Sequence, residues 1–332
     1  MTTYKGTHGT KVQNFSSDPS NPLVGQVWYN TTSDTLKINL GPPGPATWVT
    51  QNNMNTARLG LAGAGTVSAS LAIGGLTEPP QVFKAFTESY NGTSWTEVAD
   101  LNLARAKLAA SSYSPVTSSI VFAGDAGGPP PSRRTNRSET WNGSAWTDAP
   151  TLNTARAELG GAGNSATNAL AFGGEGAPGT GFQALTEIWN GSSWTETTDL
   201  PQSQAFGAGA GASSTAALSF LAYPTGYTYS WNGSNWTEVN ALNVTRYSGG
   251  GSGTNTSAVA IGGFPGDYLG KTETWNGTNW TVADDMNVPR YLMGAGGVNN
   301  ASSLAFGGAT PGQVASTEEF KQVGGVVTVT TS

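Results

Sequence analysis

Short apolar runs separated by polar turns recur along most of this chain, and their length is that of β-strands rather than helices. The clearest unit contains, in order, a small Gly-rich strand at 159–163, a polar turn at 164–168, an apolar strand at 170–172, a long Gly/Pro loop, a strand at 186–189, an Asn-Gly turn and a strand at 194–196. Asn and Gly tolerate positive φ, so their pairing predicts a tight reversal. The unit therefore predicts four short antiparallel strands.

A short motif repeats this unit along the chain: an aromatic residue, Asn-Gly, Ser or Thr, one variable residue and Trp-Thr. Its five copies begin at Tyr90, Trp141, Trp189, Trp231 and Trp275, which lie 42 to 51 residues apart. A repeat of about 40 to 50 residues with strand-like content predicts a β-propeller with one four-stranded blade per unit. The Gly-Gly after the apolar strand, the later Trp and a Leu-Asn-x-x-Arg before the next unit resemble kelch repeats.

The number of blades follows from the first strands rather than from the turns. Gly-rich first strands come after Arg58, Arg105, Arg156, Gln204, Arg246 and Arg290. The sixth unit reaches residues 317–320 and then lacks its outer strand, whereas residues 47–50 supply such a strand without a unit of their own. We therefore expect an all-β, six-bladed kelch-like propeller over residues 46–320, closed by exchange of strands between the two ends, which removes an open sheet edge.

The two ends of the chain lie outside the repeat. Residues 1–45 form an N-terminal arm, in which 25–39 predict a small β-hairpin around the turn at 31–34 and 41–45 predict a stiff Gly/Pro linker. A free hairpin is marginally stable, so we expect it to dock on a partner or on the propeller. Residues 321–332 form a C-terminal tail, and residues 326–331 of this tail could add a strand to a partner.

Composition excludes several classes of protein. The net charge of −6 and the pI of about 4.8 argue against a nucleic-acid partner. The chain contains no Cys, so we expect neither disulfides nor thiolate metal sites. We expect no membrane insertion, because there is no apolar stretch of about 18 residues, and no secretory signal peptide is visible.

The five arginines that precede first strands share a second feature. Their blades carry Glu at one matched position of the third strand, which gives the pairs Arg58 with Glu88, Arg105 with Glu139, Arg156 with Glu187, Arg246 with Glu273, and Arg290 with Glu318. The fourth blade has Gln204 and Tyr229 instead, and Ala222-Tyr223 where most blades have Gly-Gly. Features lost together predict that they interact, so we expect structural ion pairs that cross the glycines, with ligand binding as the alternative.

The face that carries the long variable loops is where binding is expected. Arg133, Arg134 and Arg137 cluster in one of these loops. On an acidic protein they suggest contact with an anionic ligand such as an acidic glycan, and the alternative is an ordinary solvated loop. Four aromatic residues also fall in these loops and could either stack on sugar rings or fold over the rim: Phe83, Phe86, Phe182 and Tyr268.

The remaining repeated or reactive residues indicate structural roles rather than catalysis. The tryptophans at one repeated position, Trp95, Trp146, Trp194, Trp236 and Trp280, predict packing between blades. Kelch-like propellers include radical copper oxidases, but these need a Cys and several His residues, and this chain has no Cys and only His8. The acidic residues that could act as a glycosidase pair, Asp125, Glu175 and Asp267, fall singly in loops. The sequence contains no Walker loop and no metal-ligand cluster. We expect no enzyme, no catalytic residue, no metal and no cofactor.

The hairpin at 25–39 resembles a segment common in tail-fibre and other virion proteins of tailed bacteriophages. In many of these proteins, especially from marine phages, it precedes Gly-rich kelch-like repeats of the same form, and the resemblance covers nearly the whole chain. It implies a virion appendage, assembled in the host cytoplasm and oligomeric in the particle. Residues 1–45 would attach to other virion proteins, and the propeller would face the host.

Three functions remain open at this point. The first is a non-enzymatic tail-fibre or receptor-binding protein whose variable loop face recognises a host surface polysaccharide. The second is a structural capsid or tail decoration protein that packs against neighbouring subunits. The third is a bacterial surface lectin, which the absence of a signal peptide disfavours.

Overall fold

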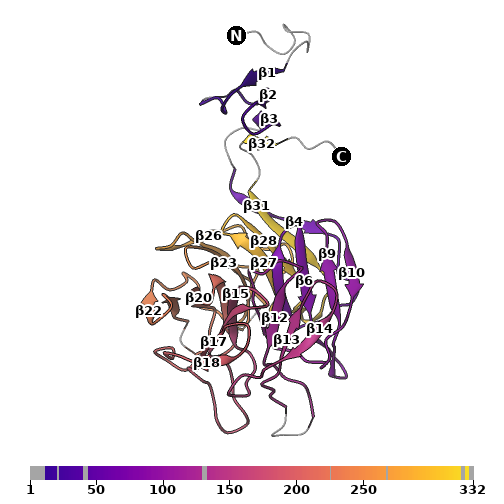
Figure 1. Cartoon of the computed structure of the whole chain (residues 1–332), viewed down its shortest axis with the longest axis vertical. Helices are drawn as coiled ribbons and strands as arrows, with labels where there is room; N and C mark the ends of the chain where they lie inside the picture. Colours follow the sequence, from indigo (N-terminus) through magenta and orange to yellow (C-terminus); the bar gives the residue numbers. More distant parts are fainter. Residues whose placement is uncertain are drawn as a thin grey trace. The chain divides into compact units, whose positions relative to one another are not determined.

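The computed structural model describes residues 12–20, 22–39, 44–128, 133–224, 226–266, 268–322 and 326–328 (Figure 1). His8, Asp267 and most of the Gly/Pro linker, at residues 41–43, lie outside the described residues. The described part of the chain consists of strands and turns, so the all-β fold class is confirmed. Within these ranges there is no helix with the length and apolar character that crossing a bilayer requires.

The chain divides into two compact units. The larger is Thr47–Lys321 and contains the repeats, and the smaller joins the two ends, Met1–Ala46 and Gln322–Ser332. The larger unit is built from four-stranded sheets, which we number in chain order. Sheet 1 contains β5 (Ala62–Thr66), β6 (Ala69–Ile73), β9 (Thr87–Tyr90) and β10 (Trp95–Val98). Sheet 2 contains β11 (Ala109–Ala110), β12 (Ser119–Phe122), β13 (Ser138–Trp141) and β14 (Trp146–Ala149).

The next three sheets repeat the same antiparallel order. Sheet 3 contains β15 (Gly160–Ser165), β16 (Asn168–Phe172), β17 (Thr186–Trp189) and β18 (Trp194–Glu196). Sheet 4 contains β19 (Ala208–Ser213), β20 (Ala216–Phe220), β21 (Thr228–Trp231) and β22 (Trp236–Val239). Sheet 5 contains β23 (Gly250–Thr254), β24 (Ser257–Ile261), β25 (Thr272–Trp275) and β26 (Trp280–Ala283).

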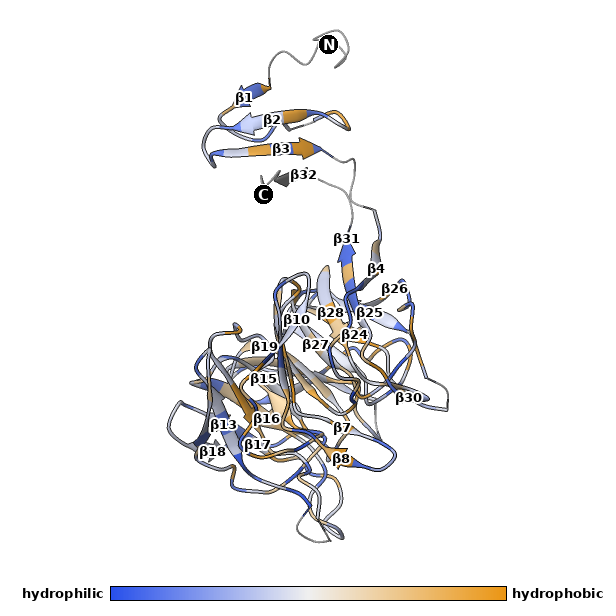
Figure 2. Cartoon of the chain, turned by 90° about the vertical axis from the view of Figure 1, so that its right-hand side faces the viewer, coloured by the Kyte–Doolittle hydropathy of each residue, from blue (hydrophilic) through white to orange (hydrophobic). Residues whose placement is uncertain are grey.

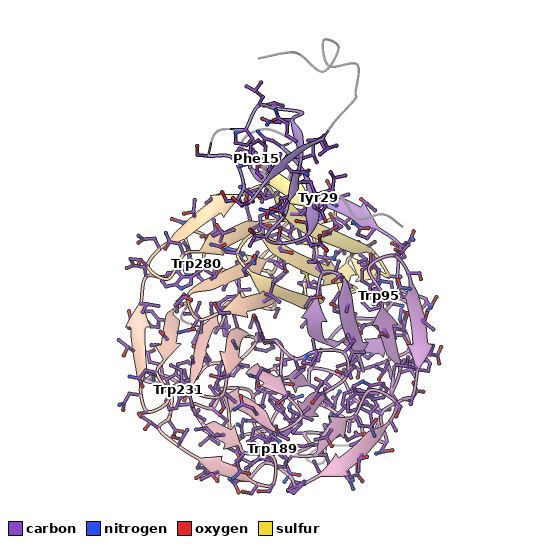
Figure 3. All side chains as sticks on the ribbon, turned by 45° about the horizontal axis from the view of Figure 1, so that its top comes forward. Phe15, Tyr29, Trp95, Trp189, Trp231 and Trp280 are labelled. Carbon is purple, nitrogen blue, oxygen red and sulfur yellow. The ribbon has the colours of Figure 1, made fainter. Side chains whose placement is uncertain are left out.

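Sheet 6 combines strands from both ends of the larger unit. It contains β27 (Gly294–Asn299), β28 (Ser302–Phe306), β31 (Thr317–Gln322) and, as its outer strand, β4 (Ala46–Gln51). Two short ribbons, β7 (Leu76–Thr77) with β8 (Val82–Phe83) and β29 (Ala309–Thr310) with β30 (Gly312–Gln313), lie in the loops. Repeated four-stranded sheets set around a common centre form a β-propeller-like fold (Figure 3).

The first strands are rich in Gly and Ala because neighbouring sheets converge there. A Cβ built on Gly209 of β19 would lie 2.3 Å from the carbonyl oxygen of Gly161 on β15. A Cβ on Gly63 of β5 would lie 2.2 Å from the carbonyl oxygen of Ala295 on β27. Any side chain at these positions would push two sheets apart, which explains the small residues of the first strands.

The apolar core lies between adjacent sheets (Figure 2). Leu71 and Ile73 of sheet 1, for example, pack in one cluster with Val121 and Trp146 of sheet 2. In the outer strands of sheets 1 to 5 the leading Trp is buried while the next two residues are exposed, as in Trp194 of β18. This alternation turns the indole ring toward the neighbouring sheet, as predicted for packing between blades.

Most of these indoles also donate a hydrogen bond to the preceding sheet. The Nε1 atom of Trp146 lies 3.0 Å from Oγ1 of Thr87, and that of Trp95 lies 3.0 Å from Oγ1 of Thr317 in sheet 6. The equivalent donor–acceptor pairs are Trp194 with Ser138, Trp236 with Thr186, and Trp48 with Thr272. At the interface between sheets 4 and 5, the buried Nε1 of Trp280 and Oγ1 of Thr228 both lack a hydrogen-bond partner among the described residues.

The smaller unit contains a four-stranded sheet of its own. β2 (Val27–Asn30) and β3 (Thr35–Asn39) form the hairpin, β1 (Gln13–Phe15) pairs with β2 in parallel, and β32 (Val326–Thr328) pairs with β3 antiparallel. Asp18 ties the hairpin together by accepting hydrogen bonds from Trp28, Asn30 and Lys37. The expectation that the C-terminal segment adds a strand to a partner is corrected for residues 326–328, because they extend the hairpin of the same chain.

Candidate functional site: the loop face

A closed cycle of backbone hydrogen bonds marks the centre of the larger unit. In each repeat, the residue two positions before the first strand donates its backbone N–H to the carbonyl oxygen of the equivalent residue in the preceding repeat, at 2.6 to 2.9 Å. In chain order the members are Gly60, Lys107, Glu158, Phe206, Ser248 and Leu292, and Gly60 donates to Leu292. All six have φ between 52° and 66°, in the left-handed region that non-glycine residues rarely adopt. Five of the six are not glycine, and the hydrogen bonds of the cycle hold them in this conformation. We call these six residues the rim ring.

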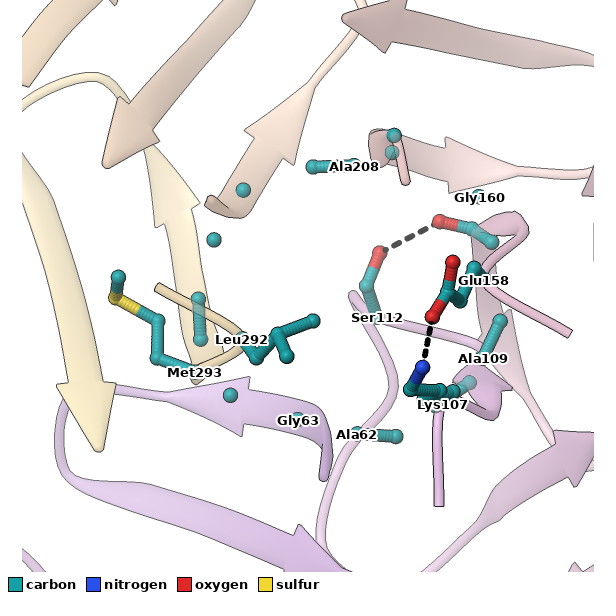
Figure 4. A pocket seen from close by; sticks show the side chains of 18 of the residues that line it. Ala62, Gly63, Lys107, Ala109, Ser112, Glu158, Gly160, Ala208, Leu292 and Met293 are labelled. Atoms are coloured by element: carbon teal, nitrogen blue, oxygen red, sulfur yellow. Dashed lines mark hydrogen bonds and ion pairs between the residues drawn. The ribbon is translucent and has the colours of Figure 1, made fainter. Parts of the chain in front are cut away.

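The rim ring lies at a central cavity of about 120 Å³ (Figure 4). Its other walls are the Gly- and Ala-rich first strands, so much of the lining is backbone rather than side chain. Among the side chains that line it, Lys107 and Glu158 carry charge and form an ion pair with each other. The cavity therefore has one charged side on a wall that otherwise consists mainly of small and apolar residues.

Glu158 is buried, with 7% of its surface exposed. One carboxylate oxygen, Oε1, contacts Lys107 Nζ, while the buried Oε2 has no hydrogen-bond partner among the described residues. Burial raises the pKa of the Glu158 carboxyl above its ordinary value, and the charge of Lys107 opposes this shift. Neither residue stands out in the sequence as a site candidate. Each lies two residues after a repeated arginine, Arg105 or Arg156, but only the structure shows that this position belongs to the hydrogen-bond cycle.

The five predicted Arg–Glu pairs are in direct contact and buried. The distances from Arg Nη1 to Glu Oε1 are 2.9 Å for Arg58–Glu88, 2.6 Å for Arg105–Glu139, 2.5 Å for Arg156–Glu187, 2.5 Å for Arg246–Glu273 and 3.2 Å for Arg290–Glu318. The Cδ atom of Arg156 lies 3.4 Å from the Cβ position of Gly174, so the arginine stem runs over that glycine. Burial lowers the pKa of Arg290 to about 10, and Glu318 opposes the shift. Such pairs hold each sheet together rather than facing a ligand.

The second oxygen of each glutamate has a partner that the sequence analysis missed. It accepts the backbone N–H of the Asn in the preceding Leu-Asn-x-x-Arg motif, at 2.8 Å for Glu187 and Asn153. The equivalent pairs are Glu88 with Asn55, Glu139 with Asn102, Glu273 with Asn243, and Glu318 with Asn287. The repeated Asn in that motif was the available signal. Each glutamate thus links the incoming segment to the arginine of its own sheet.

Sheet 4 replaces this whole arrangement. Pro201, which has no N–H, stands where the other repeats have Asn, so no carboxylate is needed to accept from it. Gln204 Nε2 donates to Ser219 Oγ at 2.6 Å, and burial raises the pKa of Tyr229 to about 12. The Gly-Gly position is corrected by one residue, from Ala222-Tyr223 to Leu221-Ala222, since Leu221 has the positive φ of the first glycine and Tyr223 bridges Ala205 as the residue after Gly-Gly does elsewhere.

The loop that carries Arg133, Arg134 and Arg137, which we call the arginine loop, has acidic partners within the chain. Arg134 contacts both Asp125, at 2.9 Å, and Glu175, and Arg133 lies 3.6 Å from Asp125. The exposed Arg137 lies 3.6 Å from Asp148. Asp125 and Glu175, which the sequence placed singly in loops, therefore meet on one arginine. Because these cations are paired with carboxylates, they do not form the excess positive surface that an acidic glycan would need.

The four predicted loop aromatics fall into two groups. Phe83 packs on the apolar cluster of Leu59, Leu76, Ala106 and Ala309, and the Phe86 ring has Lys84 Nζ 5.3 Å from its centroid. Phe182 and Tyr268, in contrast, belong to a chain of aromatic rings. Phe182 packs edge-on against Phe206 of the rim ring, and Tyr268 stacks on Tyr291 at 5.4 Å.

This chain of rings spans the loops of sheets 3 to 6. Its members, which we call the aromatic arc, are Phe182, Phe206, Tyr223, Tyr247, Phe264, Tyr268 and Tyr291, with ring centroids of neighbours 5.0 to 6.5 Å apart. Tyr223 is 41% exposed, and the other rings are half-buried. Tyr247 and Tyr291 directly follow repeated arginines, a signal that the sequence analysis did not use. The loop face thus has a charged side on sheets 2 and 3 and an aromatic side on sheets 3 to 6, and the loop of sheet 3 contributes to both.

Comparisons with known proteins bear on the fold. No protein-family model matches the sequence, and no curated protein matches it. Among solved structures the chain is similar to the structure of YjhT, with a TM-score of 0.65 and 14% sequence identity. The similarity covers 84% of this chain and 99% of that one. At this identity the likeness shows the fold alone, and with the repeated four-stranded sheets it supports a kelch-like β-propeller.

Proposed function

We propose that the chain is a six-bladed kelch-like propeller, closed by strand exchange, that binds a host-cell surface glycan as a non-enzymatic bacteriophage receptor-binding appendage. The blade number and closure draw support from the six-membered rim ring, in which Gly60 returns the cycle to Leu292, and from β4 beside β31. The phage assignment draws on the resemblance of the hairpin and repeats to virion proteins.

One observation carries the binding function: the aromatic arc beside the central cavity on the loop face. Aromatic faces offer apolar area to the C–H surface of a sugar ring, while Tyr hydroxyls and the charged side offer hydrogen bonds. Variable loops on a rigid scaffold are a common place for recognition. The paired state of the arginine loop favours a neutral glycan over the acidic one suggested by the sequence.

Binding of the full chain to an array of bacterial surface polysaccharides tests this function. The Tyr223→Ala variant removes the most exposed ring of the arc, and we expect about a tenfold loss of affinity. Ser234→Ala, in the exposed Asn-Gly turn between β21 and β22, is the matched control and should bind as the parent does. Failure of the folded chain to bind any polysaccharide would rule out the glycan function and favour structural decoration of a capsid or tail.

The location in a virion needs a separate measurement. Mass spectrometry of purified particles from a phage that encodes the chain should detect it as a stoichiometric component. Its absence from particles, together with detection on bacterial surfaces, would favour the surface-lectin alternative instead.

A further inference from the structure

Three consecutive members of the rim ring combine the groups that bind a neutral sugar. Lys107 offers an ammonium, Glu158 a carboxylate and Phe206 an aromatic ring, and all three line the central cavity. Their backbones are joined directly, because Glu158 N donates to Lys107 O and Phe206 N donates to Glu158 O. The spacing of the three side-chain attachment points is therefore fixed by the hydrogen-bond cycle rather than by a loop.

The carboxylate of Glu158 has unused hydrogen-bonding capacity. Its Oε2 is buried and has no hydrogen-bond partner among the residues that the structure describes, whereas buried polar atoms are nearly always paired. Its ion-pair partner, Lys107, is the more exposed member of the pair, with 26% of its side chain exposed. A lysine ammonium has three N–H donors on a flexible stem, so it can turn toward a ligand and uncover Oε2 while still donating.

The charges around this pair cancel. Lys107, Arg133 and Arg134 face Asp125, Glu158 and Glu175, and each of these cations contacts at least one of these carboxylates. A ligand with a net charge of either sign would leave an unmatched charge in this cluster, whereas a pair of neighbouring hydroxyls can accept from Lys107 and donate to Glu158.

We infer that Lys107, Glu158 and Phe206 form the seat for one neutral hexose unit of the bound glycan. One hydroxyl donates to Glu158 Oε2, a neighbouring hydroxyl accepts from Lys107 Nζ, and the apolar face of the sugar lies on Phe206. Phe206 continues into the aromatic arc through Phe182, Tyr223 and Tyr247, which extends the surface for further sugar units. This inference rests on the proposed function and specifies its ligand.

Saturation-transfer NMR titration of the full chain with methyl glycosides of glucose, galactose and mannose tests the seat. Sialic acid and glucosamine serve as the anionic and cationic probes. The variants exchange residues already present at equivalent positions of the rim ring, so that the backbone cycle is kept: Glu158→Ser, Lys107→Ser and Phe206→Gly. Ser234→Ala, in the exposed turn between β21 and β22 and outside the cavity lining, is again the control, and melting temperatures establish that each variant is folded.

We expect at least one neutral glycoside to bind, each of the three seat variants to weaken it about tenfold or more, and the control to bind within about twofold of the parent. Glu158→Gln should weaken it as well, because the amide replaces an acceptor by a donor at one position. Two results overturn the inference while the proposed function survives: polysaccharide binding that the seat variants do not weaken, and selective binding of a charged probe. Loss of all glycan binding by the folded parent would instead defeat the proposed function.

Discussion

Arg156 and Glu187 form a buried ion pair, with Nη1 of the arginine 2.5 Å from Oε1 of the glutamate and the other carboxylate oxygen 2.8 Å from the backbone nitrogen of Asn153. The glutamate therefore joins three parts of its repeat: the incoming segment at Asn153, the arginine four residues before the first strand, and the third strand, β17. Sheet 4 has no charge at the equivalent positions: Pro201, Gln204 and Tyr229 stand in place of Asn, Arg and Glu, and Gln204 donates a hydrogen bond to Ser219. Sheet 4 can therefore be compared, as an uncharged repeat, with the five repeats that contain a buried Arg–Glu pair.

That comparison makes the energetics of the pair testable. Glu187→Ala leaves Arg156 buried without a counter-charge, and we expect a loss of about 3 to 5 kcal/mol in the free energy of unfolding. Installing the set found in sheet 4, with Asn153→Pro, Arg156→Gln, Ala171→Ser and Glu187→Tyr together, should recover most of this loss. Urea denaturation measures both, with the exposed Glu196→Gln as control. A combined variant no more stable than Glu187→Ala would show that the two arrangements are not interchangeable.

The indole hydrogen bonds between sheets offer a second matched comparison. Thr317→Val removes the acceptor of Trp95 Nε1 and leaves a buried donor unpaired, which should cost about 1 to 3 kcal/mol. Thr228→Val removes a buried hydroxyl that has no hydrogen-bond partner in the described part of the chain, so its effect should stay within about 0.5 kcal/mol of zero or be stabilising. Thermal unfolding distinguishes the two. Equal losses would contradict a role for the hydrogen bond itself.

The buried carboxyl of Glu158 predicts a pH dependence. Its pKa is raised above the ordinary 4.5, so the folded protein holds this proton more tightly than the unfolded chain does. The charged form therefore costs stability above the folded pKa, and that cost disappears as the pH falls to about 4.5 or below. Glu158→Gln should be more stable than the parent at about pH 8, and the difference should shrink toward about pH 4. A difference that is constant with pH would exclude this carboxyl as its source.

Pairing of the two chain ends predicts a local effect of truncation. Removing residues 323–332 deletes β32 and leaves β3 with β2 as its only partner, so backbone amides of β3 should exchange with solvent faster. The larger unit should keep its melting temperature within about 2 °C, because all strands of sheets 1 to 6 remain. Hydrogen exchange followed by mass spectrometry measures both. Unchanged protection of β3 would mean that β32 adds nothing to the hairpin.

Internal repetition explains how much of the fold and site could be predicted. Each repeat acts as a variant of the others, so the joint loss of Arg, Glu and Gly-Gly in one unit pointed to a contact between residues about 30 positions apart. The same comparison predicted that Trp95 and its equivalents pack between sheets. The repeated Asn before each arginine was also visible, but its role depends on a backbone N–H, which no residue pattern displays.

Much of the loop face could not be predicted, because non-repeated loops offer no such comparison. Arg134 looked like a free cation until Asp125 and Glu175, from different repeats, were found beside it. Phe83 and Phe182 were equivalent candidates in the sequence, yet one packs on an apolar cluster and the other joins the aromatic arc.

The sequence by itself determined the strand pattern, the repeat period and the pairing of Arg with Glu within a repeat, because these depend on local alternation and on positions that recur. Only the tertiary structure decided the rim ring, the aromatic arc, the charge balance of the arginine loop and the pairing of β3 with β32. Each of these depends on how separate repeats or chain ends approach one another, and that approach is fixed by backbone packing around the centre rather than by any one segment.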